Sequence, residues 1–260
     1  MREIIDVVVL AVLQGIAEFL PVSSSGHLVV AQHLLHLDTP SMRLAVILHL
    51  GTMLSILAFY RKRLLALTLG ALRGDRSSWA TAAHIVVSAI PAAFFYFLCH
   101  DKVDAFYEDP RAVGGFLMFT GVVLCALRWM HCGDGPVTGA RALLVGIAQA
   151  LAVIPGVSRS GMTIAAARMA GIAPDTAAEF SFLMCLPLLA GGALLDLLGA
   201  TAQPAGAAAL PGWLLPAGAA ISAAVGYAAL ALLVRTLRSG RFWLFGVYCL
   251  LAGAATLLAL

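Results

Sequence analysis

Long apolar stretches alternate with short polar segments along most of the chain. A transmembrane helix needs about 20 largely apolar residues, and six stretches meet this requirement. They fall at residues 43–60, 80–99, 112–130, 177–198, 213–234 and 242–260. The pattern therefore predicts an all-α integral membrane protein with six transmembrane helices, organised as a single membrane domain over residues 1–260.

Two further apolar regions are interrupted by polar residues. Residues 4–20 contain Gln14 and Glu18 and are followed by a polar stretch, and residues 141–155 end in a Pro-Gly pair. Each region predicts two half-length helices separated by a loop. Such broken helices are tolerated at membrane depth where protein or a watery cavity surrounds the free backbone. We therefore predict two re-entrant hairpins, over residues 4–36 and 141–172.

The lysines and arginines between the spans are unevenly distributed. Ten lie in the segments 61–79, 128–141 and 235–241, whereas four lie on the opposite side of the predicted membrane. Cytoplasmic loops of membrane proteins carry an excess of Lys and Arg. We therefore expect the side with ten to be cytoplasmic, with 61–79 as a loop and both termini facing outward. The first hairpin then enters from outside and the second from the cytoplasm.

Each half of the chain thus has one hairpin and three spans, and an odd number of spans inverts the second half relative to the first. Short sequences recur between the halves: GIAE at 15–18 returns as GIAQ at 146–149, and SSSG at 23–26 returns as SRSG at 158–161. The predicted inverted repeats are residues 1–130 and 131–260. Such repeats place polar sites near the bilayer midplane, where the hairpins meet.

Composition agrees with a membrane protein. Hydrophobic residues make up 62% of the chain and charged residues 11%, with a mean hydropathy of +0.97. A soluble domain is about one quarter charged, so this chain has too little polar surface to cover a water-facing exterior. Disorder, nucleic-acid binding and a disulfide-stapled secreted fold are excluded. The five cysteines are scattered, which predicts buried thiols rather than a zinc site.

Several ionisable residues lie where the helices are broken. Charges inside a membrane cost about 2.5–3.5 kcal/mol each on insertion scales, so such residues are functional candidates. Glu18, His27 and Arg159 lie in or beside the two loops. Arg159 offers a planar fork of donors for phosphate oxygens. Helix starts expected after Ser25 and Ser160 would add free N–H groups and positive dipole ends. Two opposed helix starts, one arginine and up to five serines predict a phosphate cradle.

The same residue types could also hydrolyse a phosphate. His27 can act as base or nucleophile, Ser24 as nucleophile, and Glu18 as the group that orients the imidazole or holds a metal. Gln14 lies one helical turn before Glu18 and could share a cation or a water with it. A polar packing network between the broken helices is the alternative. His49, within a span, is expected to be a packing histidine.

Two long motifs resemble those of a known family. Residues 13–27, LQGIAEFLPVSSSGH, closely resemble the first motif of bacterial undecaprenyl-pyrophosphate phosphatases of the bacitracin-resistance type. PGVSRSGMT at 155–163 resembles their second motif, and residues 179–183 with Pro187 match the segment that follows. The resemblance implies a bacterial inner-membrane hydrolase that removes the terminal phosphate of undecaprenyl pyrophosphate. It would recycle the lipid carrier of peptidoglycan synthesis and give bacitracin resistance.

The resemblance also implies roles for individual residues. Glu18, Ser24, His27 and Arg159 would be catalytic. The substrate-binding residues would be Gln14, Ser23, Ser25, Gly26, Ser158, Ser160, Gly161 and Thr163. Family activity depends on a divalent cation such as magnesium or calcium, and Glu18 would be the one anionic ligand because position 14 is glutamine here. The nucleophile is open between Ser24, His27 and water, with Ser24 and His27 as its base preferred.

A transporter or flippase for a polyprenyl phosphate or another anion is the alternative function, because inverted broken hairpins are also a transporter design. A carrier needs the anion cradle but no nucleophile and base, so the two functions place different demands on Ser24 and His27. We expect the lipid substrate and membrane lipids as partners, and no nucleic acid. The sequence leaves the oligomeric state open. The site is expected to open to the periplasmic face.

Overall fold

The computed structural model describes residues 2–35, 42–130, 132–200 and 211–260, which form helices and the loops between them. The first half comprises α1 (Arg2–Phe19), α2 (Ser24–Leu35), α3 (Met42–Phe59), α4 (Arg61–Leu72), α5 (Arg76–Tyr107) and α6 (Pro110–Ala126). A 3-10 turn (Leu127–Trp129) then leads to α7 (Gly139–Leu151), α8 (Arg159–Met169), α9 (Pro174–Ala200), α10 (Leu214–Arg238) and α11 (Leu244–Ala259).

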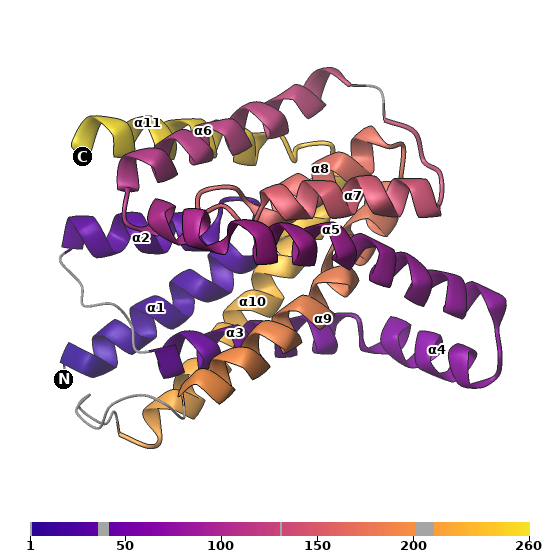
Figure 1. Cartoon of the computed structure of the whole chain (residues 1–260), viewed down its shortest axis with the longest axis horizontal. Coiled ribbons are helices and arrows are strands. Elements are labelled where there is room, and N and C mark those ends of the chain that lie inside the picture. Colours follow the sequence, from indigo (N-terminus) through magenta and orange to yellow (C-terminus); the bar gives the residue numbers. More distant parts are fainter. Residues whose placement is uncertain (1, 36–41, 131, 201–210) are drawn as a thin grey trace.

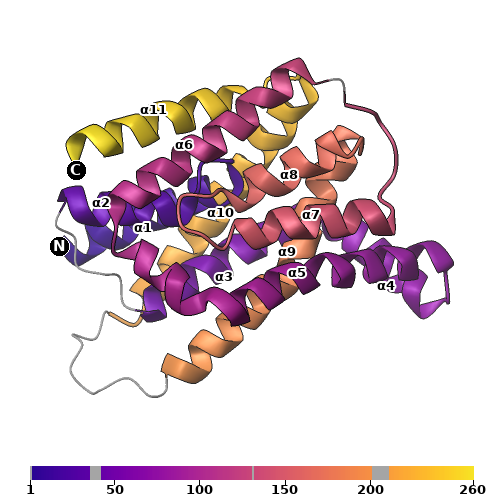
Figure 2. The ribbon, with the colours of Figure 1, turned by 45° about the horizontal axis from the view of Figure 1, so that its top comes forward.

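A helix is present at each of the six predicted spans. Among the described residues, three helices are long and apolar enough to cross a membrane: α5, α6 with the turn after it, and α10. The bent pair α3 and α4 would make a fourth. Both termini lie at one end of the molecule, and the turn between α4 and α5 lies at the other (Figures 1 and 2). The fold is that of a multi-pass helical membrane protein.

The segment 61–79 corrects one prediction. It was expected to be a loop, but most of it is α4, which follows α3 after a bend of 74°. Its leucine-rich sequence favours a helix, and α4 buries no residue because it lies beside α5 at the edge of the bundle (Figure 1). Asp75 then caps α5. Hydrogen bonds from the side chains and backbone of Ser77 and Ser78 lower the pKa of Asp75 to about 2.

The two predicted hairpins are pairs of helices joined by short loops. α1 and α2 are separated by residues 20–23, and α7 and α8 by residues 152–158. Both second helices begin slightly earlier than expected because Ser23 and Ser158 are the capping residues. Their side-chain oxygens accept hydrogen bonds from the backbone N–H of Gly26 (3.2 Å) and Gly161 (3.1 Å). Such capping satisfies donors that the helix itself leaves free.

The first helix of each hairpin packs closely against one long helix. α1 contacts α10 at Gly15, where an added Cβ would lie 2.9 Å from the carbonyl oxygen of Ser222. α7 contacts α5 at Gly146, where an added Cβ would overlap the carbonyl oxygen of Ser88. Small residues allow helix backbones to approach this closely in membranes. α6 and α11 also pack side by side along most of their length (Figures 1 and 2).

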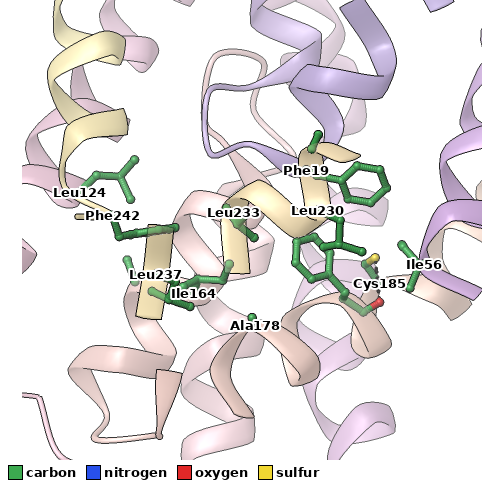
Figure 3. Packing of buried hydrophobic residues seen from close by; sticks show 13 residues of the cluster. Phe19, Ile56, Leu124, Ile164, Ala178, Cys185, Leu230, Leu233, Leu237 and Phe242 are labelled. Carbon is green, nitrogen blue, oxygen red and sulfur yellow. Dashed lines mark hydrogen bonds between the residues drawn. The ribbon is translucent and has the colours of Figure 1, made fainter. Parts of the chain in front are cut away.

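The main hydrophobic core lies where helices of both halves meet (Figure 3). It is formed by buried side chains of α1, α3, α6, α8, α9 and α10, together with Phe242, which precedes α11 in the sequence. The rings of Phe19 and Phe182 pack edge to face with centroids 5.6 Å apart. Phe19 is the last residue of α1 and fully buried. The core therefore fixes the end of α1, and with it the neighbouring Glu18.

Candidate active site

The loops of the two hairpins meet inside the helix bundle. An added Cβ at Gly26 of α2 would lie 2.9 Å from the Cα atom of Gly156 in the second loop. An added Cβ at Gly161 of α8 would lie 3.2 Å from Cβ of Pro21 in the first loop. Each helix start thus abuts the loop of the opposite hairpin. The two loops, which were expected to meet, are thus in contact at these residues.

Helices α6 and α11 hold the two loops in place. On α6, the Thr120 hydroxyl donates a hydrogen bond to the carbonyl of Gly156 and accepts one from the N–H of Ser158, both at 3.1 Å. On α11, the Cys249 thiol donates to the carbonyl of Pro21 at 3.3 Å. These contacts satisfy polar backbone atoms that would otherwise be buried without partners.

A polar cavity of about 80 Å³ lies between the loops. Its polar lining consists of Ser23, Ser24, Ser25, Ser158, Ser160, Glu18 and Arg159. The cavity sits at the N-termini of α2 and α8, where the positive ends of two helix dipoles favour an anion. The five serines, the arginine and the two helix starts of the predicted cradle lie together here, and phosphate binding by them stays a prediction. Gly26, Gly161 and Thr163 do not line the cavity. Thr163 instead donates to the carbonyl of Arg159 at 2.7 Å.

Glu18 is the centre of the hydrogen-bonding network, and its side chain is only 6% exposed. Its Oε1 atom forms an ion pair with Nη2 of Arg159. Its Oε2 atom accepts hydrogen bonds from Oγ of Ser24 at 3.0 Å and from Nε2 of Gln14 at 3.2 Å. The two hairpins are thus joined by a buried ion pair. The nucleophile candidate Ser24 is bonded to the carboxylate rather than to a histidine.

The guanidinium of Arg159 has N–H donors that the ion pair with Glu18 does not use. Its side chain is 18% exposed, and its buried Nη1 atom has no hydrogen-bond acceptor among the described residues. The Cys185 thiol lies beside the guanidinium, but sulfur is a weak acceptor. A buried donor without an acceptor is costly. An anion in the adjoining cavity would supply oxygen acceptors to this guanidinium.

His27 lies outside the Glu18 network. Its Nδ1 atom is 2.9 Å from the carbonyl oxygen of Ser23, and its Nε2 atom is 2.7 Å from the hydroxyl of Tyr248 on α11. The two rings are stacked, with centroids 5.5 Å apart. Neither ring nitrogen is bonded to Ser24, and His27 does not line the cavity. The role of His27 as the base stays a prediction. Sequence reasoning missed Tyr248, whose hydroxyl in an apolar helix was the available signal.

The structure adds His49 of α3 to the site. Its Nε2 atom lies 3.9 Å from Oε2 of Glu18, and its Nδ1 atom lies 2.9 Å from the carbonyl oxygen of Ala45. The His49 side chain is 42% exposed, so it is not packed within the span as expected. His49 lines a second cavity between α1, α2 and α3, together with Gln14, Ser24 and five apolar residues (Leu10, Leu13, Leu28, Ala45 and Leu48). The available signal was an ionisable side chain within a span.

Glu179, in the third segment of the family resemblance, does not take part in this network. Its carboxylate accepts a hydrogen bond from Nε of Arg63 on α4 at 2.7 Å. Ser181, in the same segment, is buried and pairs with Thr163 at 2.6 Å. These contacts link α9 to α4 and to α8, the helix that begins with Arg159. The segment therefore helps to hold the site in position without lining it.

The donor set does not fit a divalent cation held by the protein alone. Glu18 is the one carboxylate in the cavity lining, and both of its oxygens already have partners. Within the described part of the chain, no three His, Cys, Asp or Glu side chains cluster as a metal site would. Magnesium and calcium need six or more oxygen ligands, and Arg159 disfavours a second cation beside Glu18. The cation requirement stays a prediction.

An apolar helical bundle that encloses a cavity of serines, an arginine and a carboxylate defines an integral membrane protein with an internal polar site. The family model described as Bacitracin resistance protein BacA matches residues 7–255. The chain belongs to this family.

Curated relatives match the chain over nearly its whole length. A protein of Desulfosudis oleivorans named undecaprenyl-diphosphatase is 40% identical and covers 98% of each chain. A protein of the same name from Desulfatibacillum aliphaticivorans is 36% identical, again over 98% of each chain. One from Thermotoga maritima is 35% identical over 96% of this chain and 98% of its own.

Proposed function

We propose that this protein is a phosphatase that converts undecaprenyl pyrophosphate to undecaprenyl phosphate and inorganic phosphate. It thereby recycles the lipid carrier of peptidoglycan synthesis and gives resistance to bacitracin. The observation that carries the proposal is the serine-lined cavity, in which a nucleophile candidate, a carboxylate and an arginine with a free donor meet at two helix N-termini. The names of the relatives supply the substrate.

The diphosphate group binds between the two helix starts. The Nη1 atom of Arg159 and the hydroxyl of Ser25 donate to its oxygens. The Ser160 hydroxyl, which donates to the carbonyl of Leu20 at 3.3 Å in the structure, exchanges this bond for one to the diphosphate. The capping serines, Ser23 and Ser158, keep both helix starts in position behind it. Arg159 and the two dipoles stabilise the charge that spreads over the transferred phosphoryl group, which is the main source of catalysis in phosphoryl transfer.

Ser24 attacks the terminal phosphorus, and Glu18 is the first acceptor of its proton. The existing hydrogen bond from Oγ of Ser24 to Oε2 of Glu18 supports this assignment, because a base must lie within hydrogen-bonding reach of the proton that it removes. His27 and Tyr248 are fixed to each other at the edge of the site. His27 serves as the base only if substrate binding turns its ring toward Ser24.

The lipid tail of the bound substrate extends from the site along α1, α2 and α3. The second cavity supports this path, because Ser24 lines both cavities while the second is otherwise mostly apolar. A polyprenyl chain gains free energy from contact with apolar side chains, at roughly 25 cal/mol per Å² of apolar surface buried. The diphosphate and its first isoprene units would therefore be recognised together.

The proposal includes the inverted repeat of residues 1–130 and 131–260, with six spans and two re-entrant hairpins. It is supported by the equivalent contacts of α1 with α10 and of α7 with α5, through Gly15 and Gly146. The equivalent caps at Ser23 and Ser158 add to this support. The protein lies in the bacterial inner membrane with its basic side cytoplasmic, and the active site opens to the periplasm.

Phosphate release from undecaprenyl pyrophosphate in detergent, with magnesium or calcium supplied, tests the function. We expect release by the wild type and a loss of at least a hundredfold in Ser24→Ala. Ser239→Ala, at the exposed end of α10, is the matched control and should keep full activity. No release from folded wild type would overturn the proposal. Movement of a labelled polyprenyl phosphate across vesicles without release would instead favour the carrier.

A further inference from the structure

The hydrogen-bonding pattern of His49 fixes which of its ring nitrogens is basic. Its Nδ1 atom lies 2.9 Å from the carbonyl oxygen of Ala45. A carbonyl oxygen can only accept a hydrogen bond, so Nδ1 carries the hydrogen. In the neutral ring Nε2 therefore holds the free lone pair. This is the nitrogen that faces Oε2 of Glu18.

Two groups from other helices converge on that carboxylate oxygen, which also accepts a hydrogen bond from Gln14 of α1. Ser24 of α2 donates to it at 3.0 Å, and His49 of α3 approaches it to 3.9 Å from the second cavity. The other oxygen of Glu18 is bound by Arg159 of α8. The charged or titratable groups that face His49 in the site are thus Glu18 and, behind it, Arg159. The arrangement forms a line from the Ser24 hydroxyl through Glu18 to the free lone pair of His49.

We propose that His49 is a positioning and proton-holding residue that accepts, through Glu18, the proton lost by Ser24. This inference rests on the proposed phosphatase function. A bond forms between Oγ of Ser24 and the terminal phosphorus, and the bond to the bridging oxygen breaks, so that the lipid phosphate leaves with the electron pair. The Ser24 proton passes to Oε2 of Glu18 and on to Nε2 of His49, which releases it to solvent after the lipid product has left the second cavity.

Water then completes the turnover. It attacks the phosphoserine, its hydroxyl stays on phosphorus as inorganic phosphate, and its other proton restores the Ser24 hydroxyl. The overall reaction consumes one lipid pyrophosphate and one water. It releases lipid phosphate, inorganic phosphate and the proton that His49 held.

Binding of the substrate would strengthen the contact between Glu18 and His49. In the structure Arg159 neutralises Glu18. When the phosphate oxygens draw the guanidinium, the carboxylate keeps less of its counter-charge, and the contact that Glu18 forms with His49 after proton transfer becomes stronger. The His49 side chain is 42% exposed and lines an open cavity, so its ring has room to close the remaining distance. His27 lacks this freedom because both of its nitrogens already have partners.

Steady-state kinetics of His49→Ala and His49→Gln, with His33→Gln as the matched control, test the proposal. His33 is exposed near the end of α2, away from both cavities. We expect kcat for undecaprenyl pyrophosphate to fall about a hundredfold in both His49 variants while KM changes less than threefold, since general-base catalysis contributes about 10²–10⁴. The control should match the wild type.

Chemical rescue separates proton transfer from a structural role. Free imidazole added to His49→Ala should restore part of kcat by occupying the vacated space, and it should not accelerate the wild type or the control. Should His49→Ala fail to fold, the split between kcat and KM in His49→Gln decides, because glutamine keeps a donor for Ala45 but cannot hold the proton.

Two results would overturn the assignment. One is a kcat in His49→Gln within threefold of the wild type. The other is rescue of His27→Ala, and not of His49→Ala, by imidazole, which would give the role to His27. A folded wild type that releases no phosphate would instead refute the proposed function itself, so the two failures are distinguishable.

Discussion

The substitution Glu18→Gln removes one charge from the centre of the site and changes its shape very little. The amide still fills the space of the carboxylate. It can present its oxygen to Arg159 on one side, and Gln14 can turn its own amide to meet the new NH₂ group on the other. What is lost is the counter-charge of a guanidinium that is 18% exposed, together with the acceptor strength that Ser24 now uses.

The magnitude follows from the burial of the pair. Removing one partner of a buried ion pair costs about 3–5 kcal/mol because the other charge stays buried without compensation. Because a polar cavity adjoins Arg159, we expect the loss in the free energy of unfolding to lie near the lower end of this range, at about 3 kcal/mol. Loss of the proton acceptor should lower kcat by about 10²–10⁴, which corresponds to about 3–5 kcal/mol of barrier. Inorganic phosphate should bind more tightly, because Arg159 no longer shares its charge with Glu18.

Three measurements check this reasoning: unfolding in mixed detergent, phosphate release, and inhibition by inorganic phosphate. The double variant Glu18→Gln with Arg159→Gln should recover most of the lost stability, since it leaves no buried charge unpaired. A kcat within tenfold of the wild type would refute the role of Glu18 as acceptor. Weaker phosphate inhibition in Glu18→Gln would refute the inference that Glu18 and phosphate compete for Arg159.

Three further predictions follow from the contacts of single residues. Gly146→Ala should destabilise the fold by about 1–3 kcal/mol because the new Cβ would meet the backbone of Ser88. Gly115→Ala should not, because its Cβ would meet nothing within 4 Å. Thermal unfolding of both variants in detergent compares them. Asp75, whose folded pKa is lowered to about 2, should add stability above about pH 4 that is lost as pH falls toward 2. The difference in Tm between the wild type and Asp75→Ala should shrink over that window. Mn²⁺ added to substrate-free protein should show no stoichiometric binding by electron paramagnetic resonance, and Gln14→Glu, which adds a carboxylate, should create a detectable site.

The positions of the helices could be predicted because lipid demands long apolar runs. Those runs, and the polar interruptions at 21–27 and 155–161, are visible in one sequence. The cradle could be predicted because polar and charged side chains are costly at membrane depth, so serines and an arginine at the breaks indicate a functional site. α4 could not, because a short helix at the edge of the bundle has no apolar length to reveal it.

Contacts between distant helices were beyond sequence reasoning. The spacing of Ser24 and His27 suggests a nucleophile and its base, but Tyr248 on α11 binds the His27 ring. His49 carries an ionisable side chain on an apolar helix, and only the packing of α3 against α1 brings it to Glu18. Spacing along a helix determines which residues share a face. It does not determine which neighbouring helix that face will meet.

The two halves of the proposed repeat are chemically unequal, and Gln149 tests how far the inequality extends. Gln149 occupies the position of Glu18 in the second hairpin and is only 3% exposed. Neither its amide nitrogen nor its amide oxygen has a hydrogen-bond partner among the described residues, and it does not line the cavity. A buried amide without partners costs about 1–3 kcal/mol.

Gln149→Leu should therefore leave phosphate release unchanged and raise the stability in detergent by about 1 kcal/mol, since an apolar side chain of similar volume removes the unpaired groups without leaving a cavity. Gln149→Ala is the matched control and should be less stable than Gln149→Leu because it leaves that space empty. If Gln149→Leu kept its fold but lost activity, the amide would have to act on substrate or water. The chemistry would then belong to both hairpins rather than to the Glu18 side alone.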